Sequence, residues 1–241
     1  MFALLDITLS NYAKSNILYI LLVVPAFLLA LAAQIAVKSE YSRMSRVYSR
    51  SGYSGAQAAA AVLKYYGIEG VRIEQCSGRL SDHYDPRANV IRLSDEVFRS
   101  TSIAAIGIAC HEAGHAAQHA ENYMPIKIRN AIIPICNIGS MAGLPLALFG
   151  YFLGFETLTV IGLALYSFIM IFQLVTLPVE INASRRAVMV IEETGMLADD
   201  RELAGAKKVL RAAACTYIAS LAVSLANLLR YIVLLTRRSD D

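Results

Sequence analysis

Charged side chains are scarce in this sequence. They make up 17% of its 241 residues, whereas hydrophobic residues make up 56%. Soluble domains average about 25% charged residues, so an ordinary soluble fold is excluded. The 22 Lys and Arg nearly balance the 19 Asp and Glu, and no compact basic run with interleaved aromatic residues occurs. This excludes nucleic acid as a partner.

Cysteine is also sparse. Cys76, Cys110, Cys136 and Cys215 are scattered through the chain, without a C-x-x-C pair. Their spacing excludes a zinc ribbon and implies no disulfide framework. We expect small buried thiols in a reducing compartment.

The apolar residues are concentrated in long uncharged runs. The first, residues 17–37, has 21 residues and can cross a hydrocarbon core of about 30 Å. It is longer than the apolar part of a usual signal peptide, and only Lys14 flanks it as a basic residue. We therefore predict a retained N-terminal anchor over residues 1–37.

Two further runs, 131–154 and 157–179, carry no charge and are separated by two residues. They predict a tight transmembrane hairpin over residues 131–179, whose Gly, Pro and Ser content suits close helix packing in lipid.

The C-terminal region, residues 212–241, holds a last apolar run that Asn227 and Arg230 interrupt. It is either a fourth span in which Arg230 reaches towards the headgroups, or a helix that lies at the interface.

Residues 38–130 have the pattern of a soluble domain, with 12 Lys or Arg and 9 Asp or Glu. Residues 54–67 predict a helix with Ser54 near its N-cap and Gly67 after its end. Residues 71–75 and 89–94 predict strands, and the turn residues between them indicate a hairpin or small meander. A further helix is expected from Ser100 or Ser102 to about Glu121.

The basic residues predict the topology. Residues 38–130 and the polar helical segment 180–211, with six Lys or Arg, carry most of them, whereas the hairpin turn has none. The positive-inside rule places both segments in the cytoplasm, in a multi-pass protein of the plasma membrane. A hairpin returns the chain to the side it left, so the two segments share one compartment.

The stretch HEAGH, residues 111–115, matches H-E-x-x-H. Helix positions four apart differ by about 40° and one turn of rise, so the imidazoles of His111 and His115 can reach one ion. Glu112 lies beside that ion, where its carboxylate can take a proton from an activated water and pass it to a leaving amine. The pattern predicts zinc, two histidine ligands and Glu112 as general base.

His119 continues the four-residue spacing. It lies about 12 Å along the helix axis from His111, and Ala-Ala-Gln after His115 offers no break in the helix. We expect it not to bind the ion. It is either close to the ligands or the substrate pocket, or a plain helix-face histidine.

A third ligand must then come from elsewhere. Glu121 is on the wrong part of the same helix, and Glu156 is in the hairpin turn across the membrane. Glu180 follows the third span at the cytoplasmic edge, where an acidic residue is costly unless it is paired or bound to metal. Glu180 is the best candidate, with an ordinary interfacial glutamate as the alternative.

With these pieces in view, the chain resembles the YugP-type neutral zinc metallopeptidases of bacteria over nearly its whole length. The matching pieces are SGYSGAQAA (51–59), LSDHYDPRANVIRLS (80–94), SIAAIGIACHEAGHAAQH (102–119) and LPVEINASRRA (177–187). More distantly it is similar to the HtpX and CAAX-prenyl-protease class of membrane gluzincins, which pair H-E-x-x-H with a later E-x-x-x-D.

The resemblance implies zinc on His111, His115 and Glu180, with Glu112 as general base. Ser184 stands where the distant relatives have an Asp that would orient a ligand histidine. The implied fold is mainly α, with three to four transmembrane helices and a small α+β zincin-like catalytic domain containing a short β-hairpin or sheet.

Residues 82–86, DHYDP, are a further candidate. In related folds a sheet edge above the active helix holds the peptide as an added strand. By analogy, a hairpin carrying His83 and Tyr84 could line that cleft, and either side chain could stabilise the oxyanion. The alternative is a plain turn in which the two aspartates cap local amides.

We therefore expect a membrane-anchored zinc endopeptidase that acts on peptide or protein substrates near the cytoplasmic face of the bilayer. The alternative is a non-proteolytic scaffold or regulatory protein that keeps a structural zinc. Glu112 distinguishes the two, because a structural site needs no general base.

Overall fold

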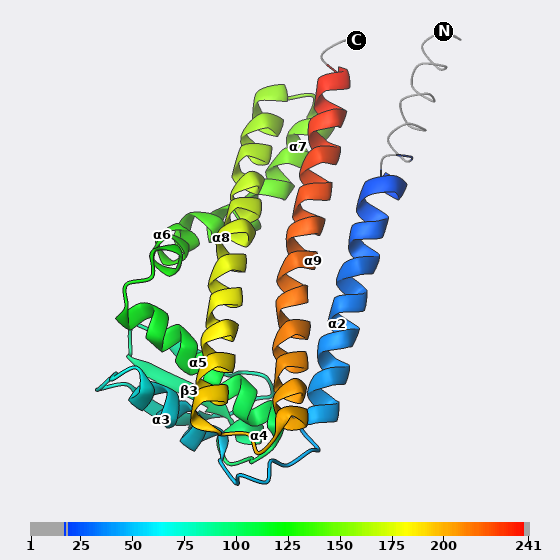
Figure 1. Ribbon diagram of the computed structural model, residues 1–241. Helices are drawn as coiled ribbons and strands as arrows, with labels where there is room; N and C mark the ends of the chain where they lie inside the picture. The colour runs from blue at the N-terminus through cyan, green and yellow to red at the C-terminus, as the bar shows by residue number, and fades with distance from the viewer. Residues whose placement is uncertain (1–16, 18, 239–241) are drawn as a thin grey trace, which may run out of the picture. The chain divides into compact units, whose positions relative to one another are not determined.

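The computed structural model describes residue 17 and residues 19–238 (Figure 1). The first part of the predicted N-terminal anchor, residues 1–16 and 18, lies outside the described residues, as do residues 239–241. The fold is mainly helical with a small mixed sheet, as predicted. The helices are α2 Val24–Met44, α3 Gly55–Tyr65, α4 Asp95–Phe98, α5 Ile103–Ala120, α6 Met124–Ile138, α7 Leu144–Leu153, α8 Glu156–Thr194 and α9 Asp200–Arg238. Two π-helical turns, η1 Tyr19–Val23 and η2 Gly139–Gly143, precede α2 and α7.

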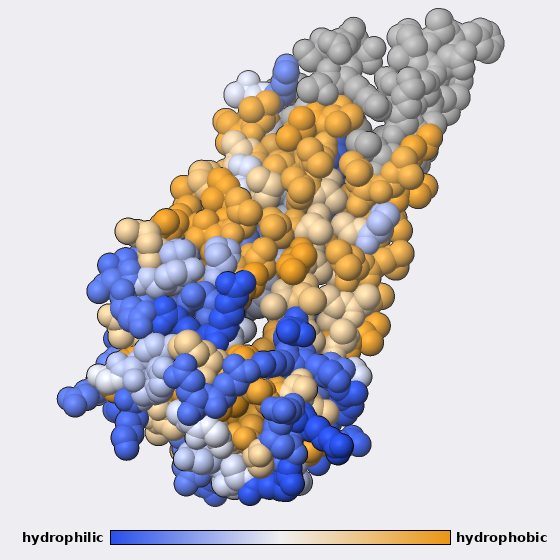
Figure 2. All heavy atoms as spheres, in the orientation of Figure 1, coloured by the Kyte–Doolittle hydropathy of each residue, from blue (hydrophilic) through white to orange (hydrophobic). Residues whose placement is uncertain are grey.

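Four helical stretches are long and apolar enough to cross a membrane. They are Tyr19–Met44, Met124–Leu153, Glu156–Thr194 and Asp200–Val233. The interrupted C-terminal run is therefore part of one continuous helix, α9. Figure 2 shows hydrophobic side chains gathered over the long helices and hydrophilic ones over the part that holds the sheet.

The chain forms two compact units. One is assembled from the apolar parts of α2 and α6–α9, and the other from Gln34–Asn130 and Val175–Cys215. In the apolar unit, small residues let the predicted hairpin close. A Cβ on Gly162 would lie 2.2 Å from the backbone nitrogen of Ala147, so only glycine permits this approach.

The polar unit follows the predicted helices closely. Ser54 caps α3 in a reciprocal capping box with Gln57, and Gly67 has a φ of +62° just after the helix. Ser102 caps α5 by accepting a hydrogen bond from the amide of Ala105. Most of α5 is buried, because α3, the sheet and the polar ends of α8 and α9 share one hydrophobic core with it.

The sheet differs from the predicted pairing. Strands β1 Arg72–Cys76 and β3 Val90–Ser94 correspond to the two expected strands, but they pair in parallel. A third strand, β2 His83–Asp85, lies antiparallel to β3 and forms the hairpin, giving the order β1-β3-β2. The expected hairpin between the first and last strands is wrong because the connection between them contains β2, which takes the other edge of β3.

The cysteines are all free. Cys110 and Cys136 are buried, as expected, and Cys76 is partly buried. The expectation of a buried thiol is wrong for Cys215, whose face of α9 is not covered by the described part of the chain.

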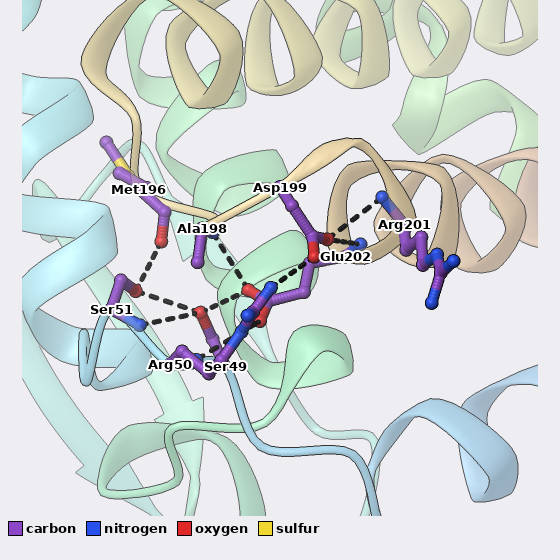
Figure 3. Close-up of polar contacts among 8 residues, drawn as sticks. All are labelled: Ser49, Arg50, Ser51, Met196, Ala198, Asp199, Arg201 and Glu202. Carbon is purple, nitrogen blue, oxygen red and sulfur yellow. Dashed lines mark hydrogen bonds and ion pairs between the residues drawn. The ribbon is translucent and has the colours of Figure 1, made fainter.

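A polar cluster around Glu202 fixes the turn between α8 and α9 (Figure 3). The buried carboxylate of Glu202 accepts hydrogen bonds from the hydroxyl of Ser49 at 2.6 Å and the amide of Ala198 at 2.9 Å. The hydroxyl of Ser51 donates to the carbonyl of Met196 at 2.6 Å. The cluster ties the loop before α3 to the end of α8, the helix that carries Glu180.

The contact between α5 and α8 predicts a sharp effect at Gly114. A Cβ there would lie 2.8 Å from the carbonyl oxygen of Ala183, and the backbone cannot move aside as a flexible side chain would. Replacing Gly114 by alanine should therefore force the two helices apart and destabilise the protein by about 1–3 kcal/mol. Thermal unfolding of the purified protein measures this loss.

Gly107 is the matched control for this change. It lies on the same helix, but its Cβ would meet the Cβ of Ala206 at 3.6 Å, an ordinary contact. The Gly107→Ala protein should be as stable as the original or slightly more so. Equal stability of the two variants would show that the α5–α8 contact is not tight.

Candidate metal centre

Helices α5 and α8 bring three ligand-type side chains together. On α5, His111 and His115 are one turn apart, with ring centroids separated by 4.7 Å. The Oε2 atom of Glu180, on α8, lies 3.2 Å from Nε2 of His111 and 3.6 Å from Nε2 of His115. In the part of the chain that the structure describes, this is the one group of three side chains spaced to share a metal ion.

The spacing fits zinc. Two atoms that each lie about 2.1 Å from a tetrahedral zinc ion are about 3.4 Å apart, close to the two separations between Glu180 and the histidines. Glu180 is only 5% exposed. A buried carboxylate is costly without positive partners. Arg129 pairs with Oε1 of Glu180, and a cation between Oε2 and the two imidazoles would balance the other oxygen. The donor set of two imidazoles and one carboxylate is that of known catalytic zinc sites.

The second nitrogen of each histidine has a partner of its own. Nδ1 of His111 lies 3.1 Å from the hydroxyl of Ser184, and Nδ1 of His115 lies 3.0 Å from Oε1 of Gln118. With Nδ1 donating to these oxygens, Nε2 of each ring is the nitrogen turned to Glu180, where it can carry a proton or bind a cation. The hydroxyl of Ser184 is thus the hydrogen-bond partner of the His111 ring at the position where an aspartate was considered.

Gln118 was not anticipated from the sequence. Its side chain is fully buried, and its amide donates to the carbonyl of Val179 at 2.8 Å and to Oδ1 of Asn182 at 2.9 Å. The amide orientation is thereby fixed, with Oε1 turned to His115. A glutamine inside the buried stretch of an apolar helix was the available signal, because a buried amide requires partners.

Arg129 was also missed. It lies on α6, and its Nη1 atom is 3.3 Å from Oε1 of Glu180. The number of residues between the HEAGH stretch and Arg129 does not indicate this contact. The contact depends on how α6 packs against α8 after the chain leaves α5.

Glu112 lies beside the cluster and contacts the sheet. Its Oε2 atom accepts a hydrogen bond of 3.1 Å from the backbone amide of Tyr84 in β2. That amide points away from β3, so the free edge of β2 faces Glu112. A proton acceptor and a free strand edge therefore lie next to the three ligand-type side chains.

The side chains of His83 and Tyr84 have other partners. Nδ1 of His83 lies 2.7 Å from the carbonyl of Ser81, and the Tyr84 hydroxyl donates to Oδ1 of Asn89 at 3.0 Å. Burial raises the pKa of the Tyr84 hydroxyl above its ordinary value. The phenol therefore stays protonated and able to donate.

His119 is not in the group of three. It is exposed at the end of α5, and its ring packs edge-on against Tyr84 at 6.0 Å between centroids.

The charges around His115 favour a cation. Burial acts to lower the pKa of this imidazole, but the hydrogen bond to Glu180 and the charge of Glu112 outweigh burial and raise the pKa above its ordinary value. The thiol of Cys110, on the same helix, behaves differently, because burial alone raises its pKa strongly. This thiol therefore stays neutral in its buried position.

Two comparisons relate the chain to known proteins. Residues 19–236 match the family described as "Putative neutral zinc metallopeptidase". The chain is 42% identical to the "Putative membrane protease YugP" of Bacillus subtilis (strain 168), over 93% of this chain and 99% of that protein. No solved structure matches the chain.

Proposed function

Because the chain belongs to the family of neutral zinc metallopeptidases, we propose that it is a membrane-anchored zinc endopeptidase. His111, His115 and Glu180 would hold the ion, and Glu112 would be the general base. The observation that carries this proposal is the convergence of three ligand atoms within 4.8 Å of one another, with a second carboxylate, that of Glu112, close enough to act on His115.

Zinc in this position would polarise the scissile carbonyl and lower the pKa of a water molecule. Glu112 is held by Tyr84 through Oε2, which leaves Oε1 free to accept the proton of the attacking water. The same oxygen would then return the proton to the amine that leaves. Ser184 and Gln118 would keep both imidazoles oriented while this happens.

The substrate would bind as an added strand on the free edge of β2. Backbone groups on that edge can pair with an extended peptide, and the amide of Tyr84 shows that the edge lies next to Glu112. This recognition uses the peptide backbone, which suits cleavage within a protein chain.

His83 or Tyr84 would stabilise the oxyanion. Tyr84 is the better placed of the two, because its backbone contacts Glu112 and its hydroxyl is a protonated donor. The hydroxyl would have to leave Asn89 to reach the substrate. Phenylalanine at position 84 tests this role, since it removes the hydroxyl and keeps the backbone contact.

We propose that the site faces the cytoplasm at the membrane of the cell. The polar segments 38–130 and 180–211 carry most of the basic residues, and basic segments stay on the cytoplasmic side. A single cysteine introduced at exposed Lys127 of a cysteine-free protein should react with an impermeant thiol reagent in inverted vesicles but not in intact cells.

Metal removal tests the proposed activity. Chelation should abolish cleavage of an unfolded protein such as casein by the detergent-purified full-length chain, because the water loses its activator. One equivalent of zinc should restore cleavage. Cleavage that persists in the metal-free protein, with zinc content checked by mass spectrometry, would rule out a metallopeptidase mechanism.

A further inference from the structure

The two carboxylate oxygens of Glu180 have different partners. Oε2 faces the histidines, at 3.2 Å from Nε2 of His111 and 3.6 Å from Nε2 of His115. Oε1 faces the guanidinium of Arg129, at 3.3 Å from Nη1. One oxygen of the carboxylate therefore faces the two imidazoles, and the other oxygen faces the arginine.

The side chain of Arg129 is partly buried, and it lies against the buried carboxylate of Glu180. The side chain of Arg129 is 24% exposed and that of Glu180 is 7% exposed. The Nε atom of Arg129 is buried and has no hydrogen-bond partner among the described residues. An arginine that served only to stabilise the fold would be expected to satisfy its buried donors, since an unpaired one is costly. This cost indicates a role beyond packing.

We propose that Arg129 is a positioning residue that holds Oε1 of Glu180 and so limits this ligand to one oxygen. The proposal rests on the proposed function, because it assumes that Glu180 binds the ion. Carboxylates bind metals through one oxygen or through both. A catalytic zinc site keeps a position for water beside three protein ligands, and a second oxygen from Glu180 would crowd that water and raise the coordination number from four to five.

Replacing Arg129 by alanine releases Oε1. The loss of a positive charge near the ion does not by itself weaken the binding of a cation. We therefore expect the variant to keep one metal per chain, to change its coordination, and to lose about 10- to 100-fold in kcat, as is typical when a partner of a metal ligand is removed. A lysine at position 129 restores one charged donor and should recover part of the rate.

Cobalt(II) substituted for zinc reports the coordination directly. Four-coordinate cobalt absorbs visible light more strongly than five-coordinate cobalt, so the absorption of Arg129→Ala should fall and that of Arg129→Lys should lie nearer to the original protein. Lys127→Ala is the matched control, since it removes one exposed positive charge two residues away on α6. Its spectrum and kcat should be unchanged.

An unchanged cobalt spectrum in Arg129→Ala would overturn the inference. So would loss of the metal from both Arg129 variants, because Arg129 would then support the site as a whole. The proposed function is judged separately on the original protein and on Glu180→Ala. If the original protein binds no metal, or Glu180→Ala binds it equally well, the ligand assignment itself is wrong.

Discussion

Replacing Glu112 by glutamine is expected to reduce peptide cleavage by about 10²- to 10⁴-fold, the contribution typical of a general acid–base residue. Glutamine has almost the same shape, and its side-chain oxygen can still accept the hydrogen bond from the amide of Tyr84. It cannot accept a proton from water. Because Glu112 is not among the three grouped ligands, the variant should still bind one zinc per chain.

The measurement is kcat/KM for one peptide, together with the zinc content of the same preparation. Glu69→Gln is the control, because Glu69 is exposed and distant in sequence from the HEAGH stretch. Equal cleavage by the original protein and by Glu112→Gln would remove the general base from the mechanism. Full zinc content with no cleavage by either protein would favour a scaffold that keeps a structural zinc.

Replacing Glu180 by alanine is expected to remove both zinc and activity. Zinc binding contributes roughly 10–16 kcal/mol of free energy to protein zinc sites. If each of three ligands supplies about a third of this free energy, removal of one ligand lowers zinc affinity by about three orders of magnitude. The change also leaves Arg129 without its carboxylate. Glutamine at position 180 keeps the shape and a neutral oxygen, so it should bind zinc better than alanine but less well than glutamate.

Competition with a zinc chelator measures these affinities. Glu192→Ala is a matched control on the same helix, since Glu192 is exposed and pairs with Lys207 away from the histidines. This variant should bind zinc normally. If the zinc affinity of Glu180→Ala equals that of the original protein, the third ligand is another residue.

The helix carrying the histidines was predictable because its chemistry is local. The spacing of His111 and His115 depends only on helix geometry, and Ser102 caps the helix as its position predicts. Glu180 required one more step, since a hairpin of two spans had to return the chain to the same side of the membrane.

The contacts that orient the ligands were not predictable in the same way. Ser184 reaches His111 because α5 and α8 approach closely at Gly114 and Ala183, a fact of tertiary packing. Gln118 lies one turn from His115 on α5, but its amide is oriented by Val179 and Asn182 of α8. The strand β2 has three residues, too few to show a periodic pattern. The sequence therefore left a hairpin and a plain turn as alternatives for these residues, and the structure has the hairpin.

The most direct test of the account is a crystal structure of the zinc-loaded protein with anomalous data collected at the zinc absorption edge. We expect one anomalous peak, with Nε2 of His111, Nε2 of His115 and one oxygen of Glu180 within about 2.2 Å of it. Glu112 should lie beside the ion without binding it. A peak that has a third protein ligand other than Glu180, or no peak near the two histidines, would contradict the account.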